Sequence, residues 1–112
     1  MGTRKTKIKM KTYIITYQLR NREKAYDDFY NAIKENMPEY RHVMESVWIV
    51  RSDKTAGEIV KLLSSHLYFL QSHCDMIFVS EINKENVDGM IAKSYWPFIT
   101  DKDEMKDEEK MG

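Results

Sequence analysis

The amino-acid sequence predicts an α+β protein built as one domain. Three apolar segments, at 12–19, 42–50 and 74–82, are separated by two stretches in which apolar residues recur at helical spacing. The chain has 112 residues, enough to bury one modest core. Its hydrophobic content of 42% and charged content of 32% are typical of a globular protein rather than of a disordered one.

The first apolar segment predicts a central strand, because β-branched and aromatic residues lie on both of its faces. A polar break follows, in which Asn21 is the expected N-cap of a helix. Pro38 should end this helix, since the residue before a proline is pushed out of the α region. The expected core side of the helix consists of apolar and aromatic residues at helical spacing: Tyr26, Phe29, Ile33 and Met37.

The segment 42–51 suits either one long strand or two short strands that turn near Glu45 and Ser46, and we favour the hairpin. Thr55 and Glu58 then have the spacing of a capping box, in which a hydroxyl and a carboxylate each bond an orphan backbone N–H group. They predict the start of a second helix, which should fray near Leu70. Its core side should carry Ile59, Leu62, Leu63, His66 and Leu67.

The last apolar segment predicts a strand with Met76, Phe78 and Ile82 on one face and with Ile77 and Val79 on the other. The single cysteine, Cys74, cannot form an intramolecular disulfide, and we expect it to be a small buried apolar residue.

A short C-terminal helix is expected to open at Asn83 and to stop before Pro97, with Val87, Met90 and Ile91 on one side. The aromatic run at 95–98 could stack nucleic-acid bases, but with Ile99 it is better explained by packing on the domain or across a dimer seam.

The order strand, helix, hairpin, helix, strand predicts a ferredoxin-like (βαββαβ) antiparallel sheet, because each long connection must return across the same face. Both helices then lie on one face of the sheet. The chain would leave the opposite face uncovered, so we expect a homodimer that packs sheet against sheet.

The net charge of zero conceals a strong segregation of charge along the chain. Residues 1–12 carry five basic residues and no acid, whereas residues 101–110 carry six acids and three lysines. We expect a basic flexible arm at 1–10, the ferredoxin-like domain at 11–100 and an acidic disordered tail at 101–112. The arm could lie along nucleic-acid phosphates, or it could be a plain flexible extension. No apolar run is long enough for a membrane span or a signal peptide, which predicts a cytoplasmic protein with no membrane partner.

Few side chains are arranged for chemistry. His73, Cys74 and Asp75 are possible zinc-ligand types, but adjacent strand residues point to opposite faces and no second ligand pair follows. His42 near Glu45 could act as an acid-base pair, or His42 could be an edge-strand histidine paired with a carboxylate or with water. The chain has only four glycines and no glycine-rich phosphate loop. We therefore expect no cofactor and no metal.

Three stretches resemble a known family. They are YIITYQL at 13–19, HVMESVWIV at 42–50 and DKTA at 53–56, and they are similar to small bacterial proteins of the SinR family. These proteins in turn resemble the smaller subunit of the CRISPR spacer-acquisition complex and the VapD toxins. The similarity spans roughly residues 10–82, and its most specific part is H-x-x-E-S-x-W-I-V. The resemblance implies a ferredoxin-like fold and a homodimer, and it raises the question of nuclease chemistry.

The chain departs from that group at one position. In the acquisition subunit the first strand ends in a Tyr-Asp pair, whose aspartates are associated with a divalent metal, whereas here Tyr17 is followed by Gln18. A neutral amide is a poor ligand for hard cations, so the resemblance does not imply metal-dependent cleavage here. Asp27 or Asp28 could serve as a replacement ligand, but acids early in a helix are more often solvated.

These observations predict a non-catalytic homodimeric scaffold that binds nucleic acid or protein. One alternative is a VapD-like endoribonuclease toxin, for which Tyr17 and His42 are the catalytic candidates. Another is a protein-interaction module of a phage or mobile element. The candidate nucleic-acid contacts are the following basic and polar residues: Arg4, Lys5, Lys7, Lys9, Gln18, Arg20 and Arg22.

Overall fold

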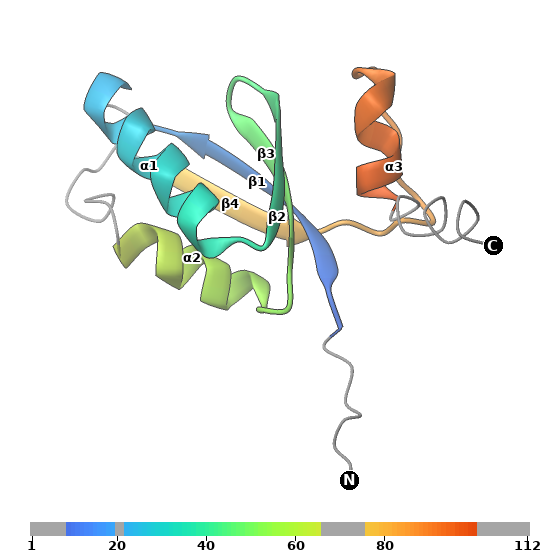
Figure 1. Ribbon diagram of the computed structural model, residues 1–112, viewed down its shortest axis with the longest axis horizontal. Coiled ribbons are helices and arrows are strands. Elements are labelled where there is room, and N and C mark those ends of the chain that lie inside the picture. Colours follow the sequence, from blue (N-terminus) through green and yellow to red (C-terminus); the bar gives the residue numbers. More distant parts are fainter. Residues whose placement is uncertain (1–8, 20–21, 66–75, 101–112) are drawn as a thin grey trace, which may run out of the picture.

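The protein is an α+β structure with one four-stranded antiparallel sheet (Figure 1). The computed structural model describes residues 9–19, 22–65 and 76–100. The elements are β1 (Lys11–Gln18), α1 (Arg22–Asn36), β2 (Glu39–Met44), β3 (Val47–Ser52), α2 (Ala56–Ser65), β4 (Met76–Glu81), the 3₁₀ turn η3 (Lys93–Tyr95) and α3 (Trp96–Ile99). The strands lie in the order β2-β3-β1-β4, and the predicted α+β class is confirmed. The arrangement is compatible with the expected ferredoxin-like layout.

The middle of the chain forms the hairpin that the sequence favoured. β2 ends at Met44 and β3 begins at Val47, so the turn falls on Glu45 and Ser46. A register shift lies between His42 and Met44, where β2 carries an extra residue beside the turn. α1 ends at Asn36, two positions before the proline that was expected to stop it. β2 already begins at residue 39, three positions earlier than the predicted strand.

The start of α2 is the predicted capping box. The backbone N–H of Glu58 donates to Thr55 Oγ1 at 3.1 Å, and the backbone N–H of Thr55 donates to Glu58 Oε1 at 2.8 Å. Two donors that the helix cannot satisfy internally are thereby paired. This local motif fixes where α2 leaves β3, and hence how its apolar side meets the sheet.

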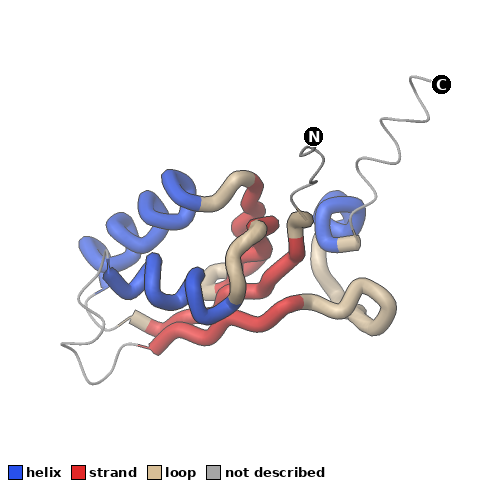
Figure 2. Tube along the Cα trace, turned by 90° about the horizontal axis from the view of Figure 1, so that it is seen from below, coloured by secondary structure: helices blue, strands red, loops and turns tan. Residues whose placement is uncertain are grey.

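The main core lies between the sheet and the pair of helices α1 and α2, which Figure 2 shows on one side of the strands. Alternate residues of β1 point into it, as the period of a strand requires. The predicted core side of α1 is confirmed, because Phe29 and Ile33 have no exposed surface and Met37 is 4% exposed. The buried members of this core are Tyr13, Ile15, Tyr17, Leu19, Phe29, Ala32, Ile33, Met37, Trp48, Val50, Ile59 and Leu63.

The opposite face of the sheet is partly covered by the chain itself, which corrects the expectation that it is bare. After β4 the chain continues past the end of the strands, and α3 lies at the end of the sheet away from α1 and α2 (Figures 1 and 2). Phe98 and Ile99 are 1% and 3% exposed and pack with Ile49 of β3. Packing of the aromatic run 95–98 on the domain, one of the two placements expected for it, is what the structure shows.

The helix predicted from Asn83 to before Pro97 is wrong in its position. Residues 83–92 contain turns, and Met90 is fully exposed. The side chain of Asn83 accepts a hydrogen bond from the backbone N–H of Glu85 at 2.9 Å, and that of Asp88 accepts one from Gly89 at 2.7 Å. Such local bonds compete with helical ones, and glycine adds a further cost.

Proline at 97 begins α3 rather than stopping a helix. It stands in the first turn of Trp96–Ile99, where its missing N–H has no intrahelical partner to lose. The short C-terminal helix therefore exists, but its start lies at the aromatic run.

Several predictions fall on residues outside the described ranges. They are residues 1–8 of the basic arm predicted at 1–10, the N-cap Asn21, the end of the second helix at His66, Leu67 and Leu70, the triplet His73, Cys74 and Asp75, and the acidic tail at 101–112. Within the part of the chain that is described, no helix combines the length and the apolar character that crossing a bilayer requires.

Candidate functional site

We call the face of the sheet opposite α1 and α2 the second sheet face, and residues 82–99, which cover part of it, the C-terminal segment. The uncovered half of this face carries a row of mostly apolar side chains. The strand register brings Thr16 of β1 opposite Val47 of β3 and opposite Phe78 of β4. Val47 in turn lies opposite Met44 of β2, so one row crosses all four strands. Met76 lies one step along β4, opposite Gln18. We call Met44, Val47, Thr16, Phe78 and Met76 the apolar row.

The apolar row is exposed in the described structure. Phe78 is 65% exposed, Met76 56% and Met44 51%. Only one other large apolar side chain among the described residues is exposed, and this is Met90, which lies in the 83–92 turns and not on a strand. Scattered apolar side chains are normal on a protein surface, whereas a contiguous group marks an interaction surface.

The row carries no charge, and the polar groups in its groove include the hydroxyl of Thr16 within the row and the neighbouring side chains of Ser46 and Gln18. Together with Val47, Met76 and Phe78, Gln18 lines a shallow groove on this face. β4 also forms an edge of the sheet, because β1 is its only neighbour among the described strands. Backbone groups along its outer side are therefore not paired within the sheet.

On the helix-covered face, the structure brings together both catalytic candidates. The Tyr17 hydroxyl oxygen lies 3.5 Å from His42 Nε2, although the two residues are 25 positions apart in the sequence. The imidazole of His42 stacks on the indole of Trp48, with ring centroids 4.3 Å apart and an interplanar angle of 7°. Tyr30 packs against both rings, at 4.9 Å and 5.3 Å.

The Tyr17 hydroxyl is already committed to structural hydrogen bonds. It donates to the backbone carbonyl oxygen of Glu45 at 2.8 Å and accepts from Trp48 Nε1 at 3.0 Å. Burial, followed by the neighbouring Tyr30, raises the pKa of Tyr17 well above its ordinary value near 10. The hydroxyl therefore stays protonated at neutral pH and cannot act as a base there.

His42 does not form the acid-base pair that its position near Glu45 allowed. His42 Nε2 lies 3.3 Å from the backbone carbonyl oxygen of Glu45, so the contact is with the main chain rather than with the carboxylate. The side chain of His42 is exposed on the edge strand β2. His42 is thus an edge-strand histidine, one of the two alternatives expected for it, but it stacks on Trp48 and its ring nitrogen contacts a backbone carbonyl oxygen rather than a carboxylate.

The metal site of the resembling proteins has no counterpart that fits at Gln18. Gln18 is exposed at the end of β1 and offers a neutral amide, and its cross-strand neighbour is Met76. This donor set lacks the anionic oxygen that a hard cation prefers. Asp27 is exposed on α1, and within the described ranges no three His, Cys, Asp or Glu side chains are grouped closely enough to hold a metal ion.

Of the candidate nucleic-acid residues, only Lys9 and Gln18 have described side chains, and these two do not lie on one surface. Lys9 is exposed just before the start of β1, whereas Gln18 is exposed at its end, about 30 Å away for nine residues of extended chain. Arg22 begins α1, but its side chain is not described, and Arg4, Lys5, Lys7 and Arg20 lie outside the described residues.

Comparison with known proteins adds no relative from which a function could be transferred. No family model, no curated protein and no solved structure matches this chain.

Proposed function

We propose that this protein is a cytoplasmic homodimeric scaffold with a ferredoxin-like fold, which binds nucleic acid or a protein without cleaving it. The exposed apolar row on the open half of the sheet is the observation that carries the proposal. The chain order of the elements and the sheet order β2-β3-β1-β4 support the ferredoxin-like layout. The resemblance to the SinR family agrees with the ferredoxin-like fold and with the homodimer.

A second copy of the chain is the occupant that best suits the apolar row. In a two-fold dimer the same surface lies on both sides of the interface, so a charged patch would bring like charges together. The row has no charged member, and the whole chain has a net charge of zero. Burying Phe78, Met76 and Met44 would stabilise the pair by removing apolar surface from water.

The binding side of the proposal rests on the basic stretch before β1. Arg4, Lys5, Lys7, Lys9 and Lys11 carry five positive charges without an acid among them. In a dimer this number doubles, and cations of this kind bind phosphates by displacing condensed counterions. Nucleic acid is therefore the first partner class to test, and a protein partner is the other.

The dimer is tested by Phe78→Lys, with Met90→Lys as the matched control. Both changes add one charge at an exposed apolar residue, but only Phe78 belongs to the apolar row. Light scattering at micromolar concentration should give a dimer mass for the wild type and for Met90→Lys, and a monomer mass for Phe78→Lys. A monomeric wild type, or dimeric Phe78→Lys, would show that the row is not the interface.

The scaffold role is tested with labelled DNA and RNA oligonucleotides over a range of salt. Binding should weaken steeply as salt rises, and a variant with Lys5, Lys7 and Lys9 changed to Gln should lose most of it. No cleavage should occur with magnesium or manganese. Binding that ignores salt, or cleavage that one substitution abolishes, would contradict the proposal.

The contact between Tyr17 and His42 supports a second candidate function, a VapD-like endoribonuclease. Because the Tyr17 hydroxyl is held by Glu45 and Trp48, His42 would be the general base toward a ribose 2′-hydroxyl and Tyr17 would position it. Expression should then arrest growth, and His42→Ala should relieve the arrest at equal protein level. Unimpaired growth on wild-type expression would exclude this candidate.

A further inference from the structure

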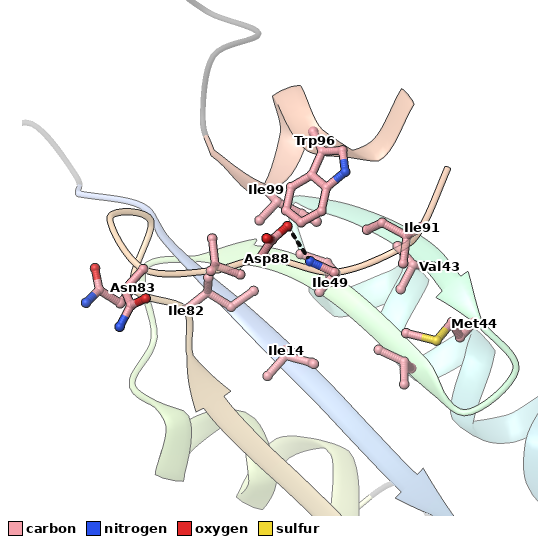
Figure 3. A pocket seen from close by; sticks show the side chains of 14 residues that line it. Ile14, Val43, Met44, Ile49, Ile82, Asn83, Asp88, Ile91, Trp96 and Ile99 are labelled. Atoms are coloured by element: carbon pink, nitrogen blue, oxygen red, sulfur yellow. Dashed lines mark hydrogen bonds between the residues drawn. The ribbon is translucent and has the colours of Figure 1, made fainter. Parts of the chain in front are cut away.

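We propose that the cavity between the C-terminal segment and the second sheet face binds a small amphipathic molecule, with a bicyclic apolar body and a cationic amine head. This inference concerns a surface within one chain and goes beyond the scaffold role. Figure 3 shows the cavity, with side chains of β1, β2 and β3 on one side and those of residues 82–99 on the other.

The body of the cavity is apolar on both sides. Ile14 and Ile49 form the sheet side, and Ile91, Trp96 and Ile99 form the opposite side. The same residues belong to, or pack against, the small core of Ile49, Phe98 and Ile99, so the walls are part of the folded domain rather than of a loose loop. An indole in the wall favours an aromatic ligand, because offset aromatic pairs add to the effect of burial.

The size of the cavity sets the size of the ligand. Its volume is about 310 Å³, at the lower end of the range of small-molecule sites. An engineered apolar cavity of about 150 Å³ in another protein holds benzene, so this one has room for a bicyclic aromatic body with a short chain.

The polar groups of the lining indicate that the ligand carries a positive charge. The amides of Asn83 and Asn86 and the carboxylate of Asp88 belong to the segment after β4, and the fourteen described lining residues include no Lys, Arg or His. Asp88 accepts one hydrogen bond, from the backbone N–H of Gly89 at 2.7 Å. A carboxylate has further acceptor positions, so an ammonium group can bind here without displacing that bond.

Gly89 offers a way to fill the cavity without disturbing its walls. A Cβ at this position would meet two atoms of the Trp96 ring at 3.9 Å, an ordinary van der Waals distance. Gly89→Leu should therefore extend along Trp96 into the space that the ligand needs. Gly57, on α2 and outside the cavity lining, gives a matched control as Gly57→Leu, because a Cβ there meets only Thr55 Oγ1 at 4.0 Å.

The experiment is a calorimetric titration with three probes that share one ring system: naphthylethylamine, naphthylethanol and naphthylacetate. The amine should bind best and the acetate worst. We expect the amine to bind about two- to fivefold more tightly than the alcohol, as for one exposed charge pair. Asp88→Asn should remove this preference, and Gly89→Leu should weaken all three probes at least tenfold while Gly57→Leu does not.

Each contrary result has a defined meaning. Absence of saturable binding, or binding that Gly89→Leu leaves unchanged, would overturn the site. An order of probes that survives Asp88→Asn would overturn the cationic head. The titration is repeated on Phe78→Lys, because Met44 and Val47 belong both to the cavity lining and to the apolar row. Binding that requires the dimer would place the probe at the subunit interface and overturn the intramolecular site, whereas binding by a monomer separates this inference from the proposed dimer.

Discussion

Tyr17 shows how one residue ties three elements together. Its ring lies in the main core, 4.4 Å from the ring of Phe29 on α1. Its hydroxyl bridges the hairpin turn and the indole of Trp48 on β3, through the carbonyl oxygen of Glu45 and Trp48 Nε1. Because Trp48 Nε1 is buried, removal of the hydroxyl would leave this buried donor without its partner.

We expect Tyr17→Phe to destabilise the protein by ~1–3 kcal/mol, the cost of leaving a buried polar group unpaired. Urea unfolding followed by circular dichroism measures this change. Tyr40→Phe is the matched control, because the Tyr40 ring also packs on Trp48 while its hydroxyl has no hydrogen-bond partner in the described structure. A loss in Tyr40→Phe as large as that in Tyr17→Phe would show that the bridge is not the cause.

Stability should fall as the pH rises above about 10, the ordinary pKa of tyrosine. Burial raises the pKa of both Tyr17 and Tyr13 in the folded state. The Tyr17 hydroxyl donates to the carbonyl oxygen of Glu45, and the Tyr13 hydroxyl donates to that of Lys54. Above pH 10 the unfolded chain releases these protons while the folded chain retains them, so deprotonation favours unfolding. Below that pH these two groups add no pH dependence.

Urea midpoints measured from pH 8 to pH 11.5 would test this titration. Tyr17→Phe should make the decline above about pH 10 shallower, because one of the two retained protons is gone. Stability that stays level through this range, or an equally steep decline in Tyr17→Phe, would contradict the prediction.

At the scale of elements, Arg51 links the C-terminal segment to the sheet. It is only 4% exposed, although it lies on β3 in the second sheet face. It bonds the carboxylate of its cross-strand neighbour Glu39 at 2.6 Å and the carbonyl oxygen of Phe98 at 2.8 Å. Its guanidinium also lies 4.3 Å from the centre of the Phe98 ring.

We expect Arg51→Met to loosen the segment 95–99 while the main core stays folded. Loss of a buried partner costs ~1–3 kcal/mol, so hydrogen exchange of these amides should accelerate about tenfold. Arg41→Met is the matched control, since Arg41 lies at the same 4.3 Å from the Phe98 ring but is exposed and donates to its own neighbour Tyr40. Equal acceleration in both variants would assign the effect to the ring contact.

At the scale of the whole molecule, association should contribute to stability. If the apolar row joins two chains, unfolding also dissociates them, so the thermal midpoint rises with protein concentration. We expect a rise of about 2–4 °C per tenfold increase for the wild type, and none for Phe78→Lys. Differential scanning calorimetry at several concentrations measures this. A midpoint independent of concentration in both proteins would argue for a monomer.

The sequence predicted most of the elements, because their signals are local. Alternation over β1, the helical spacing of Phe29 and Ile33, and the Thr55–Glu58 pair each depend on residues within a few positions of one another. The helix predicted after β4 was wrong because local spacing was again the only signal. Val87 and Ile91 have helical spacing, but Asn83 and Asp88 bond nearby backbone N–H groups, and the apolar residues turn to the sheet.

The candidate sites were predictable only as types of residue. The sequence singled out Tyr17 and His42, and the structure places them 3.5 Å apart, yet it also assigns the Tyr17 hydroxyl to Glu45 and Trp48. The cavity had no sequence signal, since its walls come from β1, β2, β3 and the C-terminal segment. Nothing in the spacing of those residues indicates that they meet.

By itself, the sequence determined the α+β class, the hairpin turn, the capping box and the absence of a carboxylate after Tyr17. Only the tertiary structure decided that residues 82–100 fold back on the sheet and that an apolar row stays exposed beside them. It also decided that a cavity lies between the sheet and this segment. The physical reason is range. Turns, caps and strand alternation follow from neighbouring residues, whereas burial of one segment on another depends on contacts between residues far apart in the chain.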